Sequence, residues 1–302
     1  MIDTIVHMVL VLAMPPLLIG VIAKTKALFA GRVGAPVLQP YYDLGRLMRK
    51  GVVISDTTSW VFKAGPVVTL AATLFAALLI PLGKHPAPVA FEGDMILFAY
   101  LFALGRFFTT AAALDTGSAF EGMGAAREVT FSCLAEPTIF FALITLTRLS
   151  GTMSLTPMLQ SVTLTVWTGT GASLLLMLFG LFVVLLAENS RIPFDDPNTH
   201  LELTMIHEVM VLDHSGPYFG CILYGAALKL YLMGALFANI AIPFSGGDPY
   251  LDWLIFGLSM LALAVGVGVV ESVMARLKLI RVPQLLVAAM ILTAFSLVLV
   301  VR

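Results

Sequence analysis

VTLTVWTGTGASLLLMLFGLFVVLLA, residues 162–187, contains no charged side chain. A helix needs roughly 20 apolar residues to cross the hydrocarbon core of a bilayer. Seven more apolar runs of similar length lie at 2–23, 62–82, 94–114, 130–149, 219–243, 251–271 and 284–301. Because lipid offers no partner to backbone N–H and C=O groups, and because these runs are too long and continuous for barrel strands, they predict helices. The sequence therefore predicts an all-α, polytopic membrane protein of about eight transmembrane helices.

Composition agrees with this fold class. Hydrophobic residues make up 59% of the chain and charged residues 12%, and the mean hydropathy is +0.99, all far from the values of soluble proteins. The two longest connections between the apolar runs, 24–61 and 188–218, are each too short for an independent domain. We therefore expect a single transmembrane domain over 1–302, with no separate flavin or dinucleotide domain.

The positions of the basic residues predict the orientation in the membrane. Of the 17 Lys and Arg residues, twelve fall in the odd-numbered connections and three at the opposite face. Cytoplasmic loops collect positive charge, so 24–61 and 188–218 are predicted to be cytoplasmic and both termini to lie on the non-cytoplasmic side. The net charge of -1 and the lack of a basic field argue against a nucleic-acid partner.

The cysteines argue against a redox centre in this chain. Cys133 and Cys221 are the only two, and each lies singly within an apolar run. Iron-sulfur clusters need several thiolates at close spacing. If the protein belongs to a redox machine, the electrons are expected to travel through other subunits.

Among the ionisable residues, three stand out at membrane depth, away from the ends of the predicted spans: Arg106, Glu136 and Lys229. Each costs several kcal/mol unless it is paired or faces a polar cavity. Glu136 follows Arg127 by nine residues, which places it roughly 13 Å from the cytoplasmic end of its helix. A buried carboxylate near a cation suits a proton carrier, but it also suits a structural ion pair that ties helices together.

Acidic residues crowd the face assigned to the cytoplasm, where the positive-inside pattern does not predict them. They are Asp115, Glu121, Glu128, Glu188, Asp195, Asp196, Glu202, Glu208, Asp213 and Glu271. Simple hydration of solvated loops is one explanation. A funnel of carboxylates that leads inward to Glu136 is the sharper hypothesis, and it favours ion transport.

Three histidines, His200, His207 and His214, repeat every seven residues. They would share one face if 198–214 were a continuous helix. Seven residues of helix span about 10.5 Å, too far for two of the rings to bind one metal ion, and we therefore predict no metal site. Proton exchange near neutral pH and ordinary interface packing remain as alternatives.

Two connections resemble signature stretches of a known family. The first reads G-R-V-G-A-P-V-L-Q-P-Y-Y-D-L-G-R-L (31–47) and the second A-E-N-S-R-I-P-F-D-D-P (187–197). Both resemble subunit 1 of the proton-pumping NADH:quinone oxidoreductases, the membrane subunit that joins the hydrophilic arm to the ion-pumping arm. Further stretches resemble the branch found in membrane-bound [NiFe]-hydrogenases, which includes formate hydrogenlyase subunit 4 and hydrogenase-4 component C. These stretches are L-D-T-G-S (114–118), G-A-A-R-E (124–128), L-A-E-P (134–137) and E-S-V-M-A-R-L-K-L (271–279).

The resemblance implies two sets of functional residues. A partner-docking surface on the two cytoplasmic connections would contain Arg32, Gly34, Pro36, Asp43, Arg191, Pro193 and Phe194. A proton pathway would match the family at Arg127, Glu128, Glu136, Glu188, Asp195 and Glu202, and we add Arg106, Asp115, Glu208, Lys229 and Glu271 to it. The chain departs from the family's spaced glutamates at Asp196, Asn198 and His200, which puts quinone chemistry in doubt.

The resemblance also implies partners and a location. The expected partners are hydrogenase large and small subunits, or complex I-like hydrophilic subunits, which would carry the [NiFe] centre and iron-sulfur clusters, together with antiporter-like membrane subunits. The expected location is the cell inner (plasma) membrane. The expected function is proton or ion translocation coupled to redox chemistry in the docked subunits. A quinone-site subunit of an NADH:quinone oxidoreductase and a standalone ion transporter are the alternatives.

Overall fold

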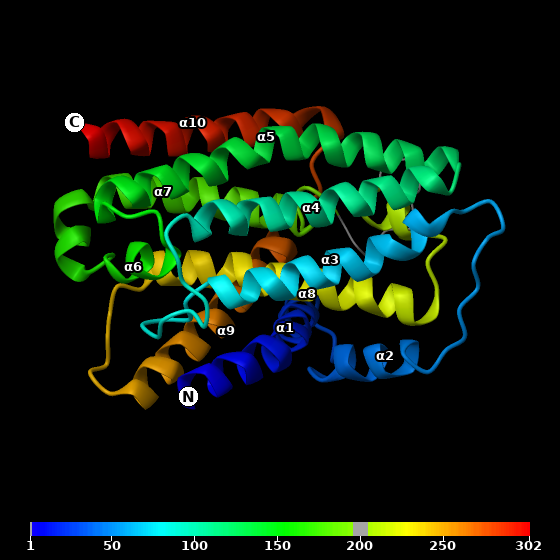
Figure 1. Cartoon of the computed structure of the whole chain (residues 1–302), viewed down its shortest axis with the longest axis horizontal. Helices are drawn as coiled ribbons and strands as arrows, with labels where there is room; N and C mark the ends of the chain where they lie inside the picture. Colours follow the sequence, from blue (N-terminus) through cyan, green and yellow to red (C-terminus); the bar gives the residue numbers. More distant parts are fainter. Residues whose placement is uncertain (1, 196–204) are drawn as a thin grey trace.

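The computed structural model describes residues 2–195 and 205–302. Within this part, helices and their connections make up the fold (Figure 1). The α-helices are α1 (Ile2–Phe29), α2 (Gln39–Leu47), α3 (Trp60–Leu79), α4 (Asp94–Asp115), α5 (Ala119–Ser150), α6 (Leu155–Gln160), α7 (Leu164–Glu188), α8 (Gly216–Ala241), α9 (Pro249–Val273) and α10 (Val282–Val301). Two short 3-10 helices, η1 (Glu208–Val211) and η2 (Leu279–Arg281), precede α8 and α10.

Eight of these helices are long and apolar enough to cross a membrane, namely α1, α3, α4, α5, α7, α8, α9 and α10. They coincide with the eight predicted runs, so the predicted all-α membrane fold is confirmed. Large apolar side chains such as Phe75, Phe107 and Phe179 are more than half exposed on the outer faces of these helices. Such exposure is unfavourable in water but favourable against lipid tails. The chain is a multi-pass membrane protein.

Two helices extend well beyond their predicted bounds: α1 continues to Phe29, whereas the predicted run ended at residue 23, and α5 begins early. Helix α5 begins at Ala119, whereas the sequence predicted a span from 130. Arg127 and Glu128 therefore lie on the helix and not in a connection. Glu136 is 17 residues from Ala119, about 26 Å along the axis instead of the 13 Å expected from the shorter run. Charged residues and glycines in the first turns lower the local hydropathy without interrupting the helix.

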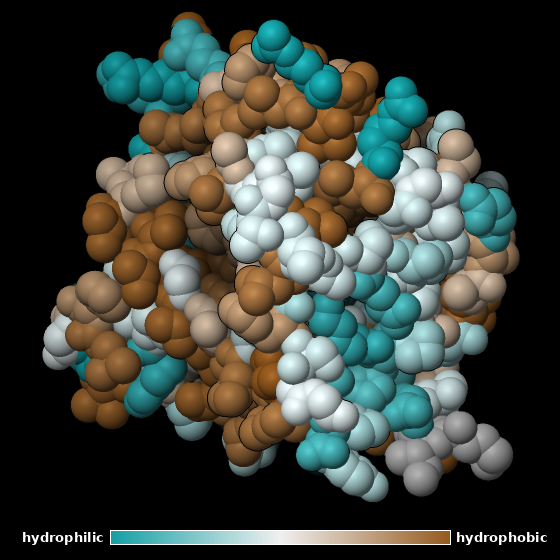
Figure 2. Space-filling model, turned by 90° about the vertical axis from the view of Figure 1, so that its left-hand side faces the viewer, coloured by the Kyte–Doolittle hydropathy of each residue, from teal (hydrophilic) through white to brown (hydrophobic). Residues whose placement is uncertain are grey.

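The long helices run side by side along the longest axis of the molecule, and both chain termini lie at the same end (Figure 1). Helix α10 packs against α5 and α7, α1 against α9, and α3 between α4 and α8. Small residues allow close approach: a Cβ atom added at Gly180 of α7 would lie 2.4 Å from Cγ2 of Thr293 in α10. Seen from the end that carries the termini, hydrophilic residues gather mainly on one side and apolar residues cover most of the rest (Figure 2).

The segment before α8 reaches into the bundle without forming a regular helix. Residues 205–207 are non-helical and η1 contains only four residues. A continuous helix over 198–214 is therefore wrong for the described residues 205–214, and His207 and His214 do not share a helical face. A glycine brings this segment close to α5, because a Cβ added at Gly124 would lie 2.3 Å from Cγ1 of Val209 and 2.9 Å from the carbonyl oxygen of Ile206.

Candidate functional site

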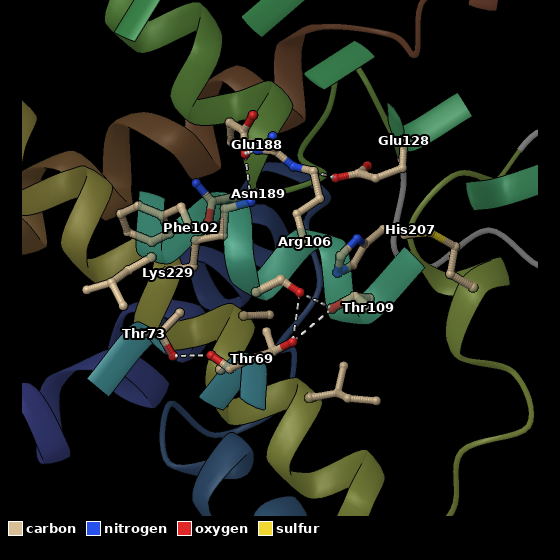
Figure 3. Close-up of a pocket in the computed structure, with 16 residues that line it drawn as sticks. Thr69, Thr73, Phe102, Arg106, Thr109, Glu128, Glu188, Asn189, His207 and Lys229 are labelled. Carbon is tan, nitrogen blue, oxygen red and sulfur yellow. Dashed lines mark hydrogen bonds and ion pairs between the residues drawn. The ribbon is translucent and has the colours of Figure 1, made fainter. Parts of the chain in front are cut away.

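A cluster of charged side chains lies in the middle of the bundle, centred on Arg106 of α4 (Figure 3). Its Nη2 donates to Oε2 of Glu188 at 2.6 Å, and its Nη1 donates to Oε1 of Glu136. Its Nε lies 3.7 Å from Oε1 of Glu128. The Arg106 side chain is only 11% exposed. Three carboxylates thus surround one guanidinium that is almost removed from solvent.

A second cation, Lys229 of α8, completes the cluster. Its Nζ donates to Oε2 of Glu188 at 2.7 Å, the same oxygen that accepts from Arg106. These residues, which we call the central cluster, come from four helices: Arg106 from α4, Glu128 and Glu136 from α5, Glu188 from α7, and Lys229 from α8. With every group ionised, three negative and two positive charges leave a net charge of -1. Binding one proton makes the central cluster neutral.

Two cavities border the central cluster, and a third adjoins one of them. The inner cavity, of about 70 Å³, is lined by Arg106, Glu128, Glu188 and Lys229 and by the hydroxyls of Thr69 and Thr109. The lateral cavity, of about 170 Å³, contacts Arg106, Glu136 and Lys229 and is otherwise lined mostly by apolar and aromatic residues of α4 and α5. The outer cavity, of about 390 Å³, lies on the other side of His207 and Asn189. A row of adjoining cavities therefore passes the central cluster, with charged side chains set in a mostly apolar lining.

The outer cavity has charged groups of its own. Glu271 of α9, whose side chain is fully buried, lies 2.9 Å from Nζ of Lys26 and 3.5 Å from Nη1 of Arg191. Asp195 accepts from Nη2 of Arg276 at 2.8 Å. The other oxygen of Asp195 accepts from the backbone N–H groups of Ile206 and His207 at 3.0 and 3.2 Å. Asp195 thereby fixes the start of the segment that carries His207.

Comparison with known proteins identifies the family of this chain. A family model described as NADH dehydrogenase matches residues 2–302, which is nearly the whole chain. The chain belongs to the NADH dehydrogenase family. The family resemblance predicted from residues 31–47 and 187–197 is thereby confirmed.

Relatives of two kinds are similar to this NADH dehydrogenase family chain. Formate hydrogenlyase subunit 4 of Escherichia coli (strain K12) is 30% identical over 90% of each chain. Hydrogenase-4 component C of the same strain is 31% identical over 78% of this chain and 73% of the relative. A subunit of the NADH-quinone oxidoreductase of Rickettsia typhi is 24% identical over 74% of this chain and 68% of the relative. The predicted similarity to hydrogenase-type relatives is confirmed.

A solved structure shares the fold of this family chain. A chain in the membrane-bound sulfane sulfur reductase, an archaeal respiratory membrane complex, superposes with a TM-score of 0.81. The match covers 99% of this chain and 98% of the other, at 21% sequence identity. The arrangement of the helices is therefore one that occurs within a larger membrane assembly.

The structure brings many of the predicted pathway residues together. Arg106, Glu128, Glu136, Glu188 and Lys229 form the central cluster, and Asp195, Glu208 and Glu271 line the outer cavity. Two others lie elsewhere. Asp115 accepts from the backbone N–H groups of Ser59 and Phe62 at 2.7 and 3.3 Å and so holds the start of α3. Arg127 donates to the carbonyl of Met205 at 2.9 Å. Glu202 is outside the described residues.

The predicted docking residues fall into an exposed and a buried group. Arg32, Gly34 and Pro36 are exposed in the first connection, and Asp43 of α2 accepts from Gln39 at 2.9 Å. Pro193 and Phe194 are buried, and the carbonyl of Pro193 accepts from the N–H of Leu277 at 2.9 Å. Arg191 is occupied with Glu271. The docking role remains a prediction, and the first connection offers the exposed side chains for it.

Sequence reasoning did not assign a role to several polar residues that line the inner cavity. Thr69 Oγ1 lies 2.9 Å from Thr109 Oγ1 and donates to the carbonyl of Gly105. Asn189 donates through Nδ2 to the carbonyl of Leu185 at 2.7 Å. For His207 the sequence left two alternatives open, proton exchange and interface packing. Thr69 and Thr109 sit in α3 and α4 with no charge or motif to mark them, so a single sequence carries no signal for them.

Proposed function

We propose that this chain is the membrane-anchoring, proton-translocating subunit of a complex I-like membrane-bound hydrogenase of the formate hydrogenlyase type. The proposal is supported by the family membership and by the names of the hydrogenase relatives, one of which is matched over 90% of each chain. The chain would hold no redox centre. The [NiFe] centre and iron-sulfur clusters are expected in docked hydrophilic subunits, and the location is expected to be the cell inner membrane.

The central cluster carries the proposal. A purely structural ion pair is most favourable when its charges balance, because any excess charge must be solvated in a poorly polarisable interior. Here Glu128, Glu136 and Glu188 exceed their cations by one charge, and cavities border the central cluster on two sides. One proton can therefore be taken up and released with no large rearrangement of the helices.

Glu136 connects this site to the edge of the molecule. Its side chain is 41% exposed, in contrast to 4% for Glu188 and 13% for Glu128, and it borders the lateral cavity between α4 and α5. A half-exposed carboxylate facing lipid is costly. A neighbouring membrane subunit, which we expect to be antiporter-like, would cover it and receive the proton there.

Coupling to redox chemistry follows from ordinary linkage. A docked subunit that changes charge or shape at the first connection and the outer cavity would favour one protonation state of the central cluster over the other. Only a difference in interaction free energy between two states can shift such an equilibrium. The charged residues that line the outer cavity, which lies between the first connection and the central cluster, would provide this difference in interaction free energy.

Replacing Glu136 tests the proposal. We expect Glu136→Gln to reduce redox-coupled proton translocation in inverted membrane vesicles by at least tenfold while the complex stays assembled. The matched control is Glu92→Gln, which changes an exposed carboxylate in a connection away from the central cluster. Full translocation by an assembled Glu136→Gln complex would refute the role.

The outer cavity favours one alternative, a quinone-site subunit of an NADH:quinone oxidoreductase. Its volume of about 390 Å³ suits a cyclic headgroup, and Lys26, Arg191 and His207 supply hydrogen-bond donors. Metal analysis of the copurified complex separates the two functions. Nickel in stoichiometric amount supports the hydrogenase, whereas its absence together with quinone reduction supports the alternative. A standalone transporter, in contrast, would move ions in liposomes that contain this chain alone.

A further inference from the structure

The inner and outer cavities share a thin wall. Four residues line both cavities: Asn189, His207, Ile222 and Ala226. Ile222 and Ala226 are apolar and Asn189 has no titratable group, so His207 is the one member of this wall that can both bind and release a proton. Its ring lies beside Arg106, between Glu128 and Thr109 (Figure 3).

The imidazole of His207 faces charged groups of both cavities. Glu128, Glu188 and Lys229 act on it from the inner cavity, which also holds Arg106. On the outer side Asp195 acts on it, and Glu208, Glu271, Lys26 and Arg191 line the same cavity. Among the described residues, no hydrogen-bond partner satisfies its buried Nδ1. The ring is thus held by its backbone, with a nitrogen left open.

Burial also sets the resting state of this ring. Removal from solvent lowers the pKa of His207 below its ordinary value of 6.5, and the nearby carboxylates only partly offset that effect. The imidazole is therefore neutral near pH 7, with one nitrogen protonated and the other a free acceptor. A neutral ring with a free nitrogen can accept a proton, whereas an imidazolium cannot.

We propose that His207 is the proton relay between the outer cavity and the central cluster. A proton that enters the outer cavity from bulk solvent binds the free ring nitrogen, and the proton on the other nitrogen passes to a carboxylate of the central cluster. Glu128 is the acceptor whose charge acts most strongly on the ring. The histidine ends neutral in its other tautomer, the carboxylate ends protonated, and no electron is transferred. The relay rests on the proposed function, because it feeds the same site.

The position of the ring, more than its open nitrogen, opposes a purely structural role. Among the described residues, Nδ1 of His7 and Nδ1 of His214 also have no hydrogen-bond partner, so an open Nδ1 does not by itself distinguish His207. His207 differs because its side chain lines two cavities that both contain charged residues, while Asp195 and Gly124 position its backbone. The arrangement fixes where the ring lies and leaves Nδ1 available.

The test uses the assembled complex in inverted vesicles, with redox turnover and proton translocation measured together. We expect His207→Gln to lower the protons moved per electron by at least tenfold while redox turnover changes less than twofold. His207→Ala should behave alike, and added imidazole should restore a measurable part of its translocation. The matched control is His214→Gln, a buried histidine of the same connection that stacks on Phe62 and lines none of these three cavities.

Each result has one meaning. Wild-type coupling in an assembled His207→Gln complex would overturn the relay, and so would loss of coupling in His207→Ala that imidazole cannot restore. If His207→Gln fails to assemble, His207→Asn and the imidazole response of His207→Ala decide the matter. Loss of translocation in Glu136→Gln but not in His207→Gln overturns the relay alone. Translocation that survives in both variants overturns the proposed function itself.

Discussion

Removing the shared carboxylate of the central cluster should expose how strongly its charges depend on one another. Glu188 accepts from Arg106 at 2.6 Å and from Lys229 at 2.7 Å, and its side chain is 4% exposed. Glu188→Gln keeps the shape but removes the charge. Arg106 retains Glu136 and Glu128, whereas Lys229 loses the carboxylate that it contacts. Leaving one member of a buried pair uncompensated costs about 3–5 kcal/mol.

A double-mutant cycle isolates that cost. Lys229→Met alone leaves the central cluster with two surplus negative charges and should also destabilise by several kcal/mol. The double variant Glu188→Gln/Lys229→Met has neither the charge of Glu188 nor that of Lys229. Its decrease in the free energy of unfolding should therefore be smaller than the sum of the decreases in the two single variants, by about 2 kcal/mol or more. Unfolding by denaturing detergent in mixed micelles, followed by circular dichroism, measures the three free energies.

The control for this cycle is Glu92→Gln with Lys278→Met, two exposed residues in separate connections. Those substitutions should add to within about 0.5 kcal/mol, as expected for independent sites. If the decreases in the free energy of unfolding caused by Glu188→Gln and Lys229→Met add as closely as those of the control pair, the two charges do not stabilise each other and the expectation is wrong.

Two further predictions concern the segment that carries His207 and its neighbour His214. Gly124→Val should destabilise by about 1–3 kcal/mol, since even a Cβ would lie 2.3 Å from Val209, and it should lower coupled translocation although His207 is unchanged; thermal unfolding and vesicle assays measure both. Burial lowers the pKa of His214, so the unfolded chain binds a proton more readily than the folded one. The free energy of unfolding therefore carries the full contribution of neutral His214 above about pH 6.5 and decreases as the pH falls below it, by up to about 1.4 kcal/mol per pH unit. His214→Gln should reduce this dependence on pH. Equal slopes in both proteins would contradict this origin.

How much of the molecule could be predicted depended on how local each signal is. The eight spans could be predicted because local hydropathy alone identifies an apolar run of bilayer length. Arg106, Glu136 and Lys229 could be identified because they are charges within such runs. Glu188 ends a run, and nothing local shows that it reaches the same point as Lys229, 41 residues away. The early start of α5 was missed because Arg127 and Glu128 lower the hydropathy of turns that pack inside the protein.

The position of His207 was beyond sequence reasoning for a different reason. Its ring is placed by a non-helical segment, by hydrogen bonds to Asp195, and by the space over Gly124, none of which has a periodic pattern. The one visible regularity, the seven-residue spacing to His214, suggested a helix that residues 205–214 do not form.

Distributing the central cluster over four helices also constrains how the chain is made. The first three of these helices, α4, α5 and α7, enter the bilayer during synthesis before all of their partners exist, and an arginine at the centre of a span costs about 2.5–3.5 kcal/mol at the insertion machinery. Arg106 of α4 therefore depends on the carboxylates of α5, which is synthesised next, whereas Lys229 of α8 arrives after Glu188 is already in place. Biogenesis should thus proceed by a hairpin of α4 and α5, and truncation between these helices should leave a nascent chain that quality control removes.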